Sequence, residues 1–318
     1  MRAPFLLEAA MVFPVADAHC DFLYGAVQSG YDIANRKPVQ VTALSELLAG
    51  HVSMQFFACW TDTSLRTSPL HQCVAMIDAY RRMLKANDAL VPFTKDFDPA
   101  SGKIASVLTI EGGEAVEGSL AVLRTLHALG VRAMTLTWNE SNELSGAAMQ
   151  KNRRGLTTLG REIIAEMNRI GVAVDLAHLS DAGIDDVLSI STQPVFASHS
   201  NARSVFPSPR SLSDAQIKEI AKQGGVIGVN FYSKQLTDRP VAVIDDIVRQ
   251  ILHIVSVGGE NCCAIGSDFD GMQRYPKGLE TAAGFPLLLD ALLNSGLPAE
   301  TVAKIAYWNL HNYISKFA

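Results

Sequence analysis

The sequence predicts an α/β fold, a (β/α)₈ TIM-like barrel. Short β-rich runs alternate with helix-length stretches, eight such runs can be counted, and nearly all of them end in polar side chains. In a barrel, the carboxyl ends of all strands converge on one face, where the chemistry of such folds takes place. A doubly wound open sheet is the alternative, but it would spread those ends along a line.

The size and composition of the chain suit one large domain. It has 318 residues, of which 48% are hydrophobic and 19% are charged, and no shift in composition divides it. We therefore expect a single domain over residues 1–318. The net charge of −5, without a long basic run, argues against a nucleic-acid partner. No stretch reaches the roughly 18 consecutive apolar residues of a membrane span, so none is predicted.

The predicted strands are nearly continuous apolar runs, which is typical of a parallel sheet buried on both faces. In chain order they are Phe13–Asp21, Ser53–Trp60, Ser106–Gly112, Ala133–Asn139, Val172–His178, Pro194–His199, Gly225–Tyr232 and Cys262–Asp268.

Several of these runs are separated by stretches long enough to be helices. We predict helices over Leu70–Leu90, Ser119–Leu129, Thr157–Ile170, Ser213–Gln223 and Val241–Val257. A glycine follows four of them and favours a helix C-terminus there: Gly130, Gly171, Gly224 and Gly258. The segment Leu287–Ser315 is predicted to form two helices separated at Gly296 and Pro298.

The cysteine content indicates a reducing compartment. The five cysteines are odd in number and irregularly spaced, without a CxxC pair, so a cytoplasmic location fits best. The apolar stretch Ala3–Val15 resembles a signal peptide loosely. Glu8 interrupts it, and no A-x-A-like cleavage site precedes Asp17, so we expect no secretory signal.

Two of the run ends carry carboxylates suited to a metal. His19 and Asp21 lie two residues apart, so on a strand their side chains would point to the same face and could bind one ion. Glu111 ends an apolar run before Gly112-Gly113, and would lie in the barrel mouth. Taken alone, the first pair could be a strand-end histidine beside a surface aspartate, and Glu111 could simply begin a loop.

Two histidines end the consecutive runs Val172–His178 and Pro194–His199. Together with His19, Asp21 and Glu111 they form a set of three imidazoles and two carboxylates. Such a set suits two zinc ions if one carboxylate bridges them. A single ion with a spare histidine is the alternative.

Two further residues are candidates for chemistry beside the ligands. Asp268 ends the eighth run, where a carboxylate could take a proton from water and pass it to a leaving amine. The alternative, a calcium-binding DxDG turn, lacks the required downstream Glu. Arg210, on the loop after His199, could bind a carboxylate through two parallel hydrogen bonds, or could be a solvated loop residue.

As a set, these motifs resemble the membrane (renal) dipeptidase family, peptidase family M19. The resemblance extends from about Asp17 to Asn309. The matching segments are Asp17–Asp21, Ile110–Gly113, Gly155–Gly160, Glu166–Asn168, Val174–Ser180, Ser198–Ser200, Pro209-Arg210, Gly224–Val226, Val229–Tyr232 and Gly266–Gly271.

The resemblance implies a barrel of the metal-dependent hydrolase type and a zinc-dependent dipeptidase, with two zinc ions per chain and a hydroxide bridging them. His19 and Asp21 would bind one ion, His178 and His199 the other, and Glu111 would bridge both. Asp268 would act as acid and base. Arg210 would bind the free C-terminal carboxylate of a dipeptide, L,D-dipeptides included, and Tyr232 is a further substrate-binding residue. Members of the family often dimerise, which leaves a homodimer open.

The sequence departs from the family at Trp138, where well-known members have a histidine that contacts the substrate. We expect the indole to form a wall of the pocket near the second residue of the dipeptide; an ordinary core tryptophan is the alternative. Two other functions are weighed. A related barrel amidohydrolase could act on another carboxylate-bearing amide or lactone, and a non-catalytic module could merely bind metal. The presence of Asp268 and of every ligand argues against the latter.

Overall fold

A computed structural model describes residues 12–318, and in them the predicted barrel is confirmed. Its strands are all parallel and close in the order β1-β2-β4-β5-β6-β7-β8-β9, with β9 pairing β1. The barrel strands are β1 Val15–Asp17, β2 Val52–Trp60, β4 Ile104–Glu111, β5 Val131–Thr135, β6 Ala173–Asp175, β7 Phe196–Ala197, β8 Val226–Val229 and β9 Cys263–Ile265.

Each predicted run overlaps one barrel strand, and most of the strands end before the run does; β2, β4 and β5 begin before their runs, at Val52, Ile104 and Val131. Residues 136–139 lie beyond β5, and Asp268 lies beyond β9. The reason is conformational, because residues such as His178 and Asp268 have positive φ angles, of 68° and 63°, which no strand residue adopts. One strand was not predicted: β3, Leu90–Pro92, pairs with the first half of β4 outside the barrel ring.

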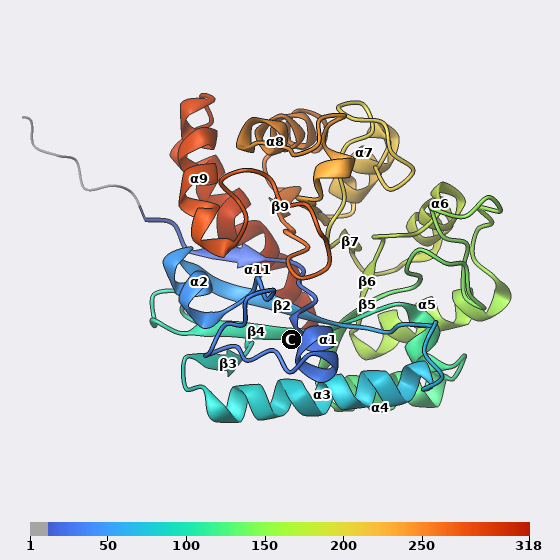
Figure 1. Ribbon diagram of the computed structural model, residues 1–318. Helices are drawn as coiled ribbons and strands as arrows, with labels where there is room; N and C mark the ends of the chain where they lie inside the picture. Colours follow the sequence, from blue (N-terminus) through green and yellow to red (C-terminus); the bar gives the residue numbers. More distant parts are fainter. Residues whose placement is uncertain (1–11) are drawn as a thin grey trace, which may run out of the picture.

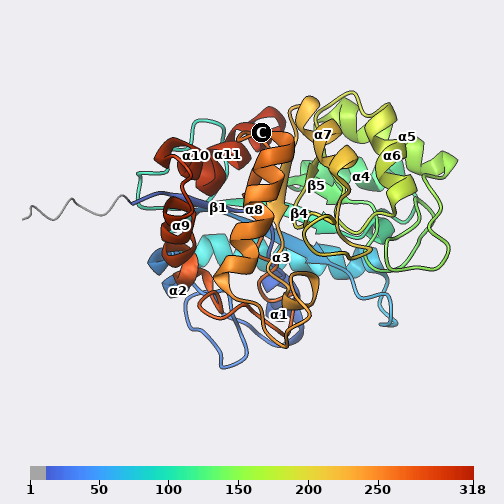
Figure 2. The same ribbon diagram turned by 90° about the horizontal axis from the view of Figure 1, so that it is seen from above.

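Helices surround the strands, with α3 and α4 on one side of the barrel and α7 and α8 on the opposite side (Figure 1). In the view from above, α8 crosses over α3 (Figure 2). The α-helices are α1 Phe22–Gln28, α2 Leu44–Ala49, α3 Pro69–Ala86, α4 Leu120–Ala128, α5 Thr158–Ile170, α6 Asp181–Ile190, α7 Asp214–Lys222, α8 Ile244–Gly258, α9 Phe285–Asn294, α10 Ala299–Ala303 and α11 Asn309–Ile314.

Most predicted helix ends lie within one residue of these bounds, but the helix predicted to end at Leu90 ends at Ala86, and the helix predicted to begin at Val241 begins at Ile244. Ser119, Thr157 and Ser213 each cap a helix by accepting a hydrogen bond from a backbone N–H of its first turn. Gly130, Gly171 and Gly224 have the positive φ expected after a helix. The fourth predicted glycine is wrong by one position, because Gly258 is the last residue of α8 and Gly259 has the positive φ of 86°.

The C-terminal helices close the end of the barrel opposite the strand carboxyl ends. Tyr313 donates a hydrogen bond to the carbonyl of Pro194, just before β7, and Asn309 donates to the carbonyl of Cys263 at the start of β9. Inside the barrel, small alanine side chains such as those of Ala105 and Ala173 leave space. Aromatic side chains, including that of Tyr307, fill this space. The barrel interior is therefore a packed core, and its other end is free for chemistry.

The five cysteines are unpaired and buried. Among residues 12–318, no helix combines the length and the apolar character needed to cross a membrane. The stretch Ala3–Val15 lies mostly outside the described residues, so the expectation that it is no signal peptide stays a prediction. The cytoplasmic location likewise stays a prediction.

Candidate metal centre

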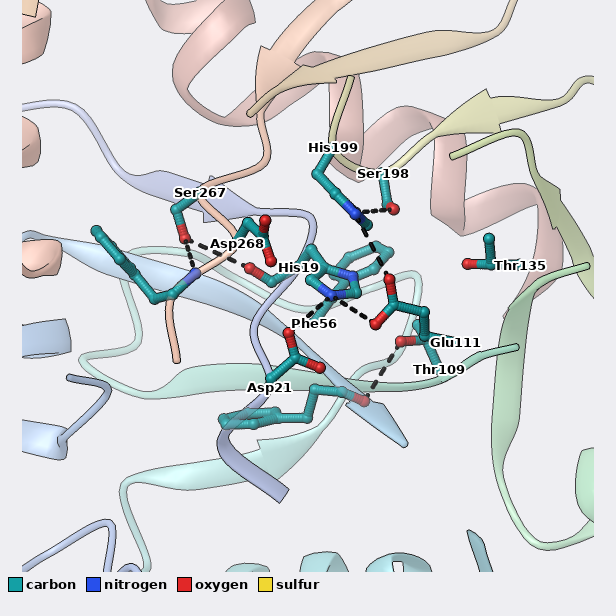
Figure 3. A network of polar contacts seen from close by, with 12 residues as sticks. His19, Asp21, Phe56, Thr109, Glu111, Thr135, Ser198, His199, Ser267 and Asp268 are labelled. Carbon is teal, nitrogen blue, oxygen red and sulfur yellow. Dashed lines mark hydrogen bonds and ion pairs between the residues drawn. The ribbon is translucent and has the colours of Figure 1, made fainter. Parts of the chain in front are cut away.

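Six of the predicted site residues meet at the carboxyl ends of the strands, and Figure 3 shows five of them, His19, Asp21, Glu111, His199 and Asp268. Their ligand atoms form three overlapping groups, each within 4.8 Å: His19 with Asp21 and Glu111, Glu111 with His178 and His199, and His19 with His199 and Asp268. They come from the ends of β1, β4, β6, β7 and β9. The fold therefore brings together residues that lie up to 249 positions apart in the sequence. All six are buried.

Glu111 lies at the middle of the cluster, between the two pairs of predicted ligands. Its Oε1 is 2.9 Å from Nε2 of His178 and 3.6 Å from Nε2 of His199. Its Oε2 is 3.5 Å from Nε2 of His19, which is in turn 3.4 Å from Oδ2 of Asp21. One carboxylate oxygen thus faces each pair, which is the arrangement that a carboxylate bridging two ions requires.

The donor atoms fit metal ions. Nε2 of His19 and Oδ1 of Asp21 are buried and have no hydrogen-bond partner, and Nε2 of His178 lies only 2.9 Å from Nε2 of His199. Buried polar atoms are normally paired, so this concentration of unshared lone pairs indicates a ligand. Imidazole nitrogen and carboxylate oxygen are donors that zinc takes in proteins.

Two histidines are oriented from behind by hydrogen bonds at their other ring nitrogen. Nδ1 of His178 lies 3.0 Å from Oδ1 of Asn139, and Nδ1 of His199 lies 2.8 Å from Oγ of Ser198. Donation from Nδ1 leaves the lone pair of Nε2 directed at the cluster, a usual arrangement around bound metals. Asn139 and Ser198 were not predicted, although Asn139 ends a predicted run.

The charges of the cluster are shifted by burial and by one another. Burial and the nearby guanidinium of Arg210 lower the pKa of His178 to about 4, so the imidazole is neutral, as a ligand must be. Burial opposes the ionisation of Glu111, but His19 and His178 outweigh it and hold the pKa of this carboxyl well below its usual range. Burial, aided by Asp21 and Glu111, raises the pKa of Asp268 to about 8. The site thus combines an ionised carboxylate with one that holds a proton more readily.

Gly271 is the residue that lets the last loop approach the cluster. A Cβ atom there would lie 2.2 Å from Oδ2 of Asp21 and 2.4 Å from Oδ1 of Asp268. Any other residue would therefore push both carboxylates aside. Asp268 is also held by Asn230, whose Nδ2 donates to its Oδ2 over 3.0 Å.

A cavity of about 230 Å³ opens onto the cluster. Glu111, His178 and Asp268 line it, and so do the predicted substrate residues Trp138 and Tyr232. A larger cavity of about 620 Å³ is lined mainly by apolar residues of the opposite barrel end and shares no residue with the cluster. The smaller cavity is therefore the one where chemistry can occur.

Three aromatic rings form one wall of the smaller cavity. Trp60 packs edge-on against Trp138 with ring centroids 4.8 Å apart, and against Tyr24 at 4.6 Å. The ring of Trp138 lies 6.3 Å from that of His178. Tyr24 and Trp60 were not predicted as site residues. Trp60 could have been identified from the sequence because it ends a predicted run. In the structure it pairs with Glu111 in the register of β2 and β4.

Arg210, like His19 and His199, is a predicted site residue that does not line the cavity. It is buried, its Nη2 donates to the carbonyl of His199 over 3.2 Å, and its Nε has no partner. Burial lowers its pKa to about 10, which leaves it charged at neutral pH. A buried cation with a free donor, close enough to affect the pKa values of His178 and His199, is suited to an anionic group.

Comparisons with known proteins match nearly the whole chain to one family model. Residues 5–316 match the family model described as membrane dipeptidase, peptidase family M19. The chain is 33% identical to a *Schizosaccharomyces pombe* protein described as an uncharacterized dipeptidase, covering 94% of this chain and 79% of that protein. A second *S. pombe* dipeptidase-like protein is 37% identical, with 78% of this chain and 65% of that protein covered. Rat dipeptidase 3 is 32% identical, and the match covers 96% of this chain and 66% of the rat protein.

Solved structures of the same fold cover nearly the whole chain. A dipeptidase structure assigned to family M19 superimposes with a TM-score of 0.90 at 27% identity, covering 96% of this chain and 99% of that one. A *Rhodobacter sphaeroides* metallopeptidase, bound to a phosphinate mimic of L-Ala-D-Ala, has a TM-score of 0.89 at 24% identity, covering 97% and 100%.

Proposed function

The chain belongs to the membrane dipeptidase family, peptidase family M19, and on that premise we propose that it hydrolyses dipeptides with a free C-terminal carboxylate, L,D-dipeptides among them, using two zinc ions. The observation that supports this most is Glu111, with one carboxylate oxygen facing His178 and His199 and the other facing His19 beside Asp21. Two zinc ions held there would activate water and stabilise charge on the scissile carbonyl oxygen.

His19 and Asp21 would hold one ion, His178 and His199 would hold the other, and Glu111 would contact both. Asp268 is the acid and base: it accepts a proton from the attacking water and delivers it to the leaving amine. Its carboxylate lies within 4.8 Å of ligand nitrogens of His19 and His199, where it can exchange a proton with the attacking water and the leaving amine. The hydrogen bond from Asn230 fixes the carboxylate toward the cluster.

Arg210 binds the C-terminal carboxylate of the substrate in this proposal. The support is its burial, its charge and its unpartnered Nε. Its Nη2 contacts the carbonyl of His199, so in this proposal it meets the substrate beside the end of β7. Tyr232, on the cavity wall, contacts the substrate as well. L,D-dipeptides are included because a protein of this fold binds a mimic of L-Ala-D-Ala.

Trp138 limits the size of the second residue of the dipeptide. Trp138→Ala is expected to improve kcat/KM for a bulky second residue relative to alanine by about tenfold, since pocket contacts of one or a few methylenes discriminate by that order. A panel of dipeptides that vary only at the second residue measures this ratio. Trp308→Ala is the matched control, because Trp308 lies on the C-terminal helix and outside this cavity. An unchanged ratio in Trp138→Ala would show that Trp138 does not limit the size of the second residue.

Removal and return of zinc tests the proposed function as a whole. We expect chelated protein to hydrolyse neither L-Ala-L-Ala nor L-Ala-D-Ala, and hydrolysis to rise until two zinc ions per chain have been added. Metal content and product release are measured in the same samples. Full activity at a reproducible one ion per chain would contradict the dinuclear site, and absence of hydrolysis at two ions would contradict the dipeptidase.

A further inference from the structure

Asp17 is a buried carboxylate below the cluster that no part of the proposed mechanism uses. It is the last residue of β1 and is fully buried. Its Oδ1 accepts from the backbone N–H of Ser267 at 2.8 Å and of His19 at 3.4 Å. Its Oδ2 accepts from Oγ of Ser267 at 2.6 Å and from Nε2 of Gln55 at 3.1 Å. Asp17 therefore joins the loop that bears His19 to the loop that bears Asp268.

Asp175 makes the same kind of contacts on another part of the barrel. It is the last residue of β6 and is buried. Its Oδ1 accepts from the backbone N–H of Ala177 at 3.0 Å and of Ser198 at 2.9 Å. Its Oδ2 accepts from Oγ1 of Thr135 at 2.8 Å. Asp175 therefore joins the residue before His178 to the residue before His199.

The two aspartates occupy equivalent places in the ring of strands. Each accepts from a side chain on one neighbouring strand, β2 or β5, and from the backbone just after the other neighbouring strand, β9 or β7. In the closed order of the barrel, β1 and β6 are four strands apart in either direction, which places them opposite one another. Each aspartate thus spans three consecutive strands beneath one pair of predicted ligands.

Neither aspartate can be a ligand itself. All four of their oxygens accept hydrogen bonds, and neither residue lines the cavity or belongs to a group of metal-binding side chains. Burying a carboxylate is costly unless its oxygens are satisfied by donors. Here most of the donors are on loops that present ligands, including the loop in which His178 has a φ of 68°. The carboxylates are therefore placed to hold these loops in one geometry.

We propose that Asp17 and Asp175 are positioning residues, each of which sets the zinc affinity of one of the two metal sites. Asp17 acts on the site of His19 and Asp21, and Asp175 acts on the site of His178 and His199. This inference rests on the proposed function for the identity of the ligands. It goes further, because it assigns the strength of each site to a residue that does not touch the metal.

Asparagine variants test the inference through zinc binding. In Asp17→Asn and Asp175→Asn, an amide NH₂ replaces one acceptor oxygen and faces donors, so the loops lose hydrogen bonds. Loss of an outer partner of a metal ligand typically costs about 10–100-fold in metal affinity. To resolve the sites, each change is made in His199→Ala protein, which keeps the first site, and in His19→Ala protein, which keeps the second. Zinc affinity is measured by competition with a chromophoric chelator, without substrate.

We expect Asp17→Asn to weaken zinc binding about 10–100-fold in the His199→Ala background and less than about threefold in the His19→Ala background, and Asp175→Asn to do the reverse. Asp246→Asn is the matched control, because Asp246 is a buried carboxylate that accepts from the backbone N–H of Val243, at the start of α8. It should change neither affinity. Equal loss in both backgrounds, or loss no greater than in Asp246→Asn, would overturn the inference.

Milder variants keep the test valid if an asparagine variant does not fold. Ser267→Ala removes one donor to Asp17, and Thr135→Val removes one donor to Asp175 with little change of shape. Each should weaken zinc binding roughly 2–10-fold at its own site only. The outcome is separate from that of the proposed function: selective zinc loss in a protein that hydrolyses no dipeptide would contradict the dipeptidase alone. Unselective loss in an active dipeptidase would contradict this inference alone.

Discussion

Asp268→Asn is expected to lower kcat for dipeptides by roughly 10²–10⁴-fold, the usual contribution of a positioned acid or base, while zinc content stays at two ions per chain. An asparagine side chain has nearly the same shape and can still contact Asn230, but it cannot carry a proton between water and the leaving amine. The loss should therefore fall on kcat more than on KM, because the proton is moved in the transition state.

Measurement of kcat and zinc content in the same preparation separates this role from a structural one. Asp246→Asn serves again as the control for loss of a buried carboxylate, and it should retain the kcat of the unaltered protein. If Asp268→Asn also keeps near-normal kcat, another group transfers the proton. If it loses zinc together with activity, Asp268 is a ligand, as its proximity to His19 and His199 would allow.

The ligand set could be predicted from sequence because chemistry limits it to a few residue types at particular positions. His19, Asp21, Glu111, His178 and His199 each stand at or just after an apolar run, and parallel strands bring such ends together. The same apolar runs, alternating with helix-length stretches, also predicted the barrel. The family resemblance added which of these residues would share an ion. The spacing of the residues alone left open whether they bind one ion or two.

The parts that could not be predicted depend on contacts between distant residues or on backbone conformation. Asp17 and Ser267 are 250 residues apart, and nothing local to either indicates their hydrogen bond. The end of β5 at Thr135 was misplaced, because a run of apolar residues does not show where the chain leaves the strand. The contact between Trp60 and Trp138 requires the register of β2, β4 and β5, which no periodicity reveals.

Arg210→Ala is expected to lower kcat/KM for a free dipeptide roughly 10–150-fold, since a hydrogen bond to a charged group contributes about 1.5–3 kcal/mol. For the same dipeptide amidated at its C-terminus the change should be small, because no carboxylate is present for Arg210 to bind. Arg210→Lys should recover only part of the loss, since an ammonium group cannot reproduce the planar, two-pronged contact of a guanidinium. Equal losses on both substrates would mean that Arg210 acts only through its hydrogen bond to the His199 carbonyl.

The central claim is that this barrel recognises a dipeptide by its free carboxylate beside a two-metal centre. The most direct measurement is kcat/KM of the unaltered, zinc-loaded protein for L-Ala-D-Ala and for its C-terminal amide. A dipeptide places its carboxylate a short, fixed distance from the scissile carbonyl, and Arg210, bonded to the carbonyl of His199, is the proposed partner of that carboxylate. We predict that the free dipeptide is preferred roughly 10–150-fold, the value of that charged hydrogen bond. Equal hydrolysis of the two would contradict the account and indicate an amidohydrolase without carboxylate recognition.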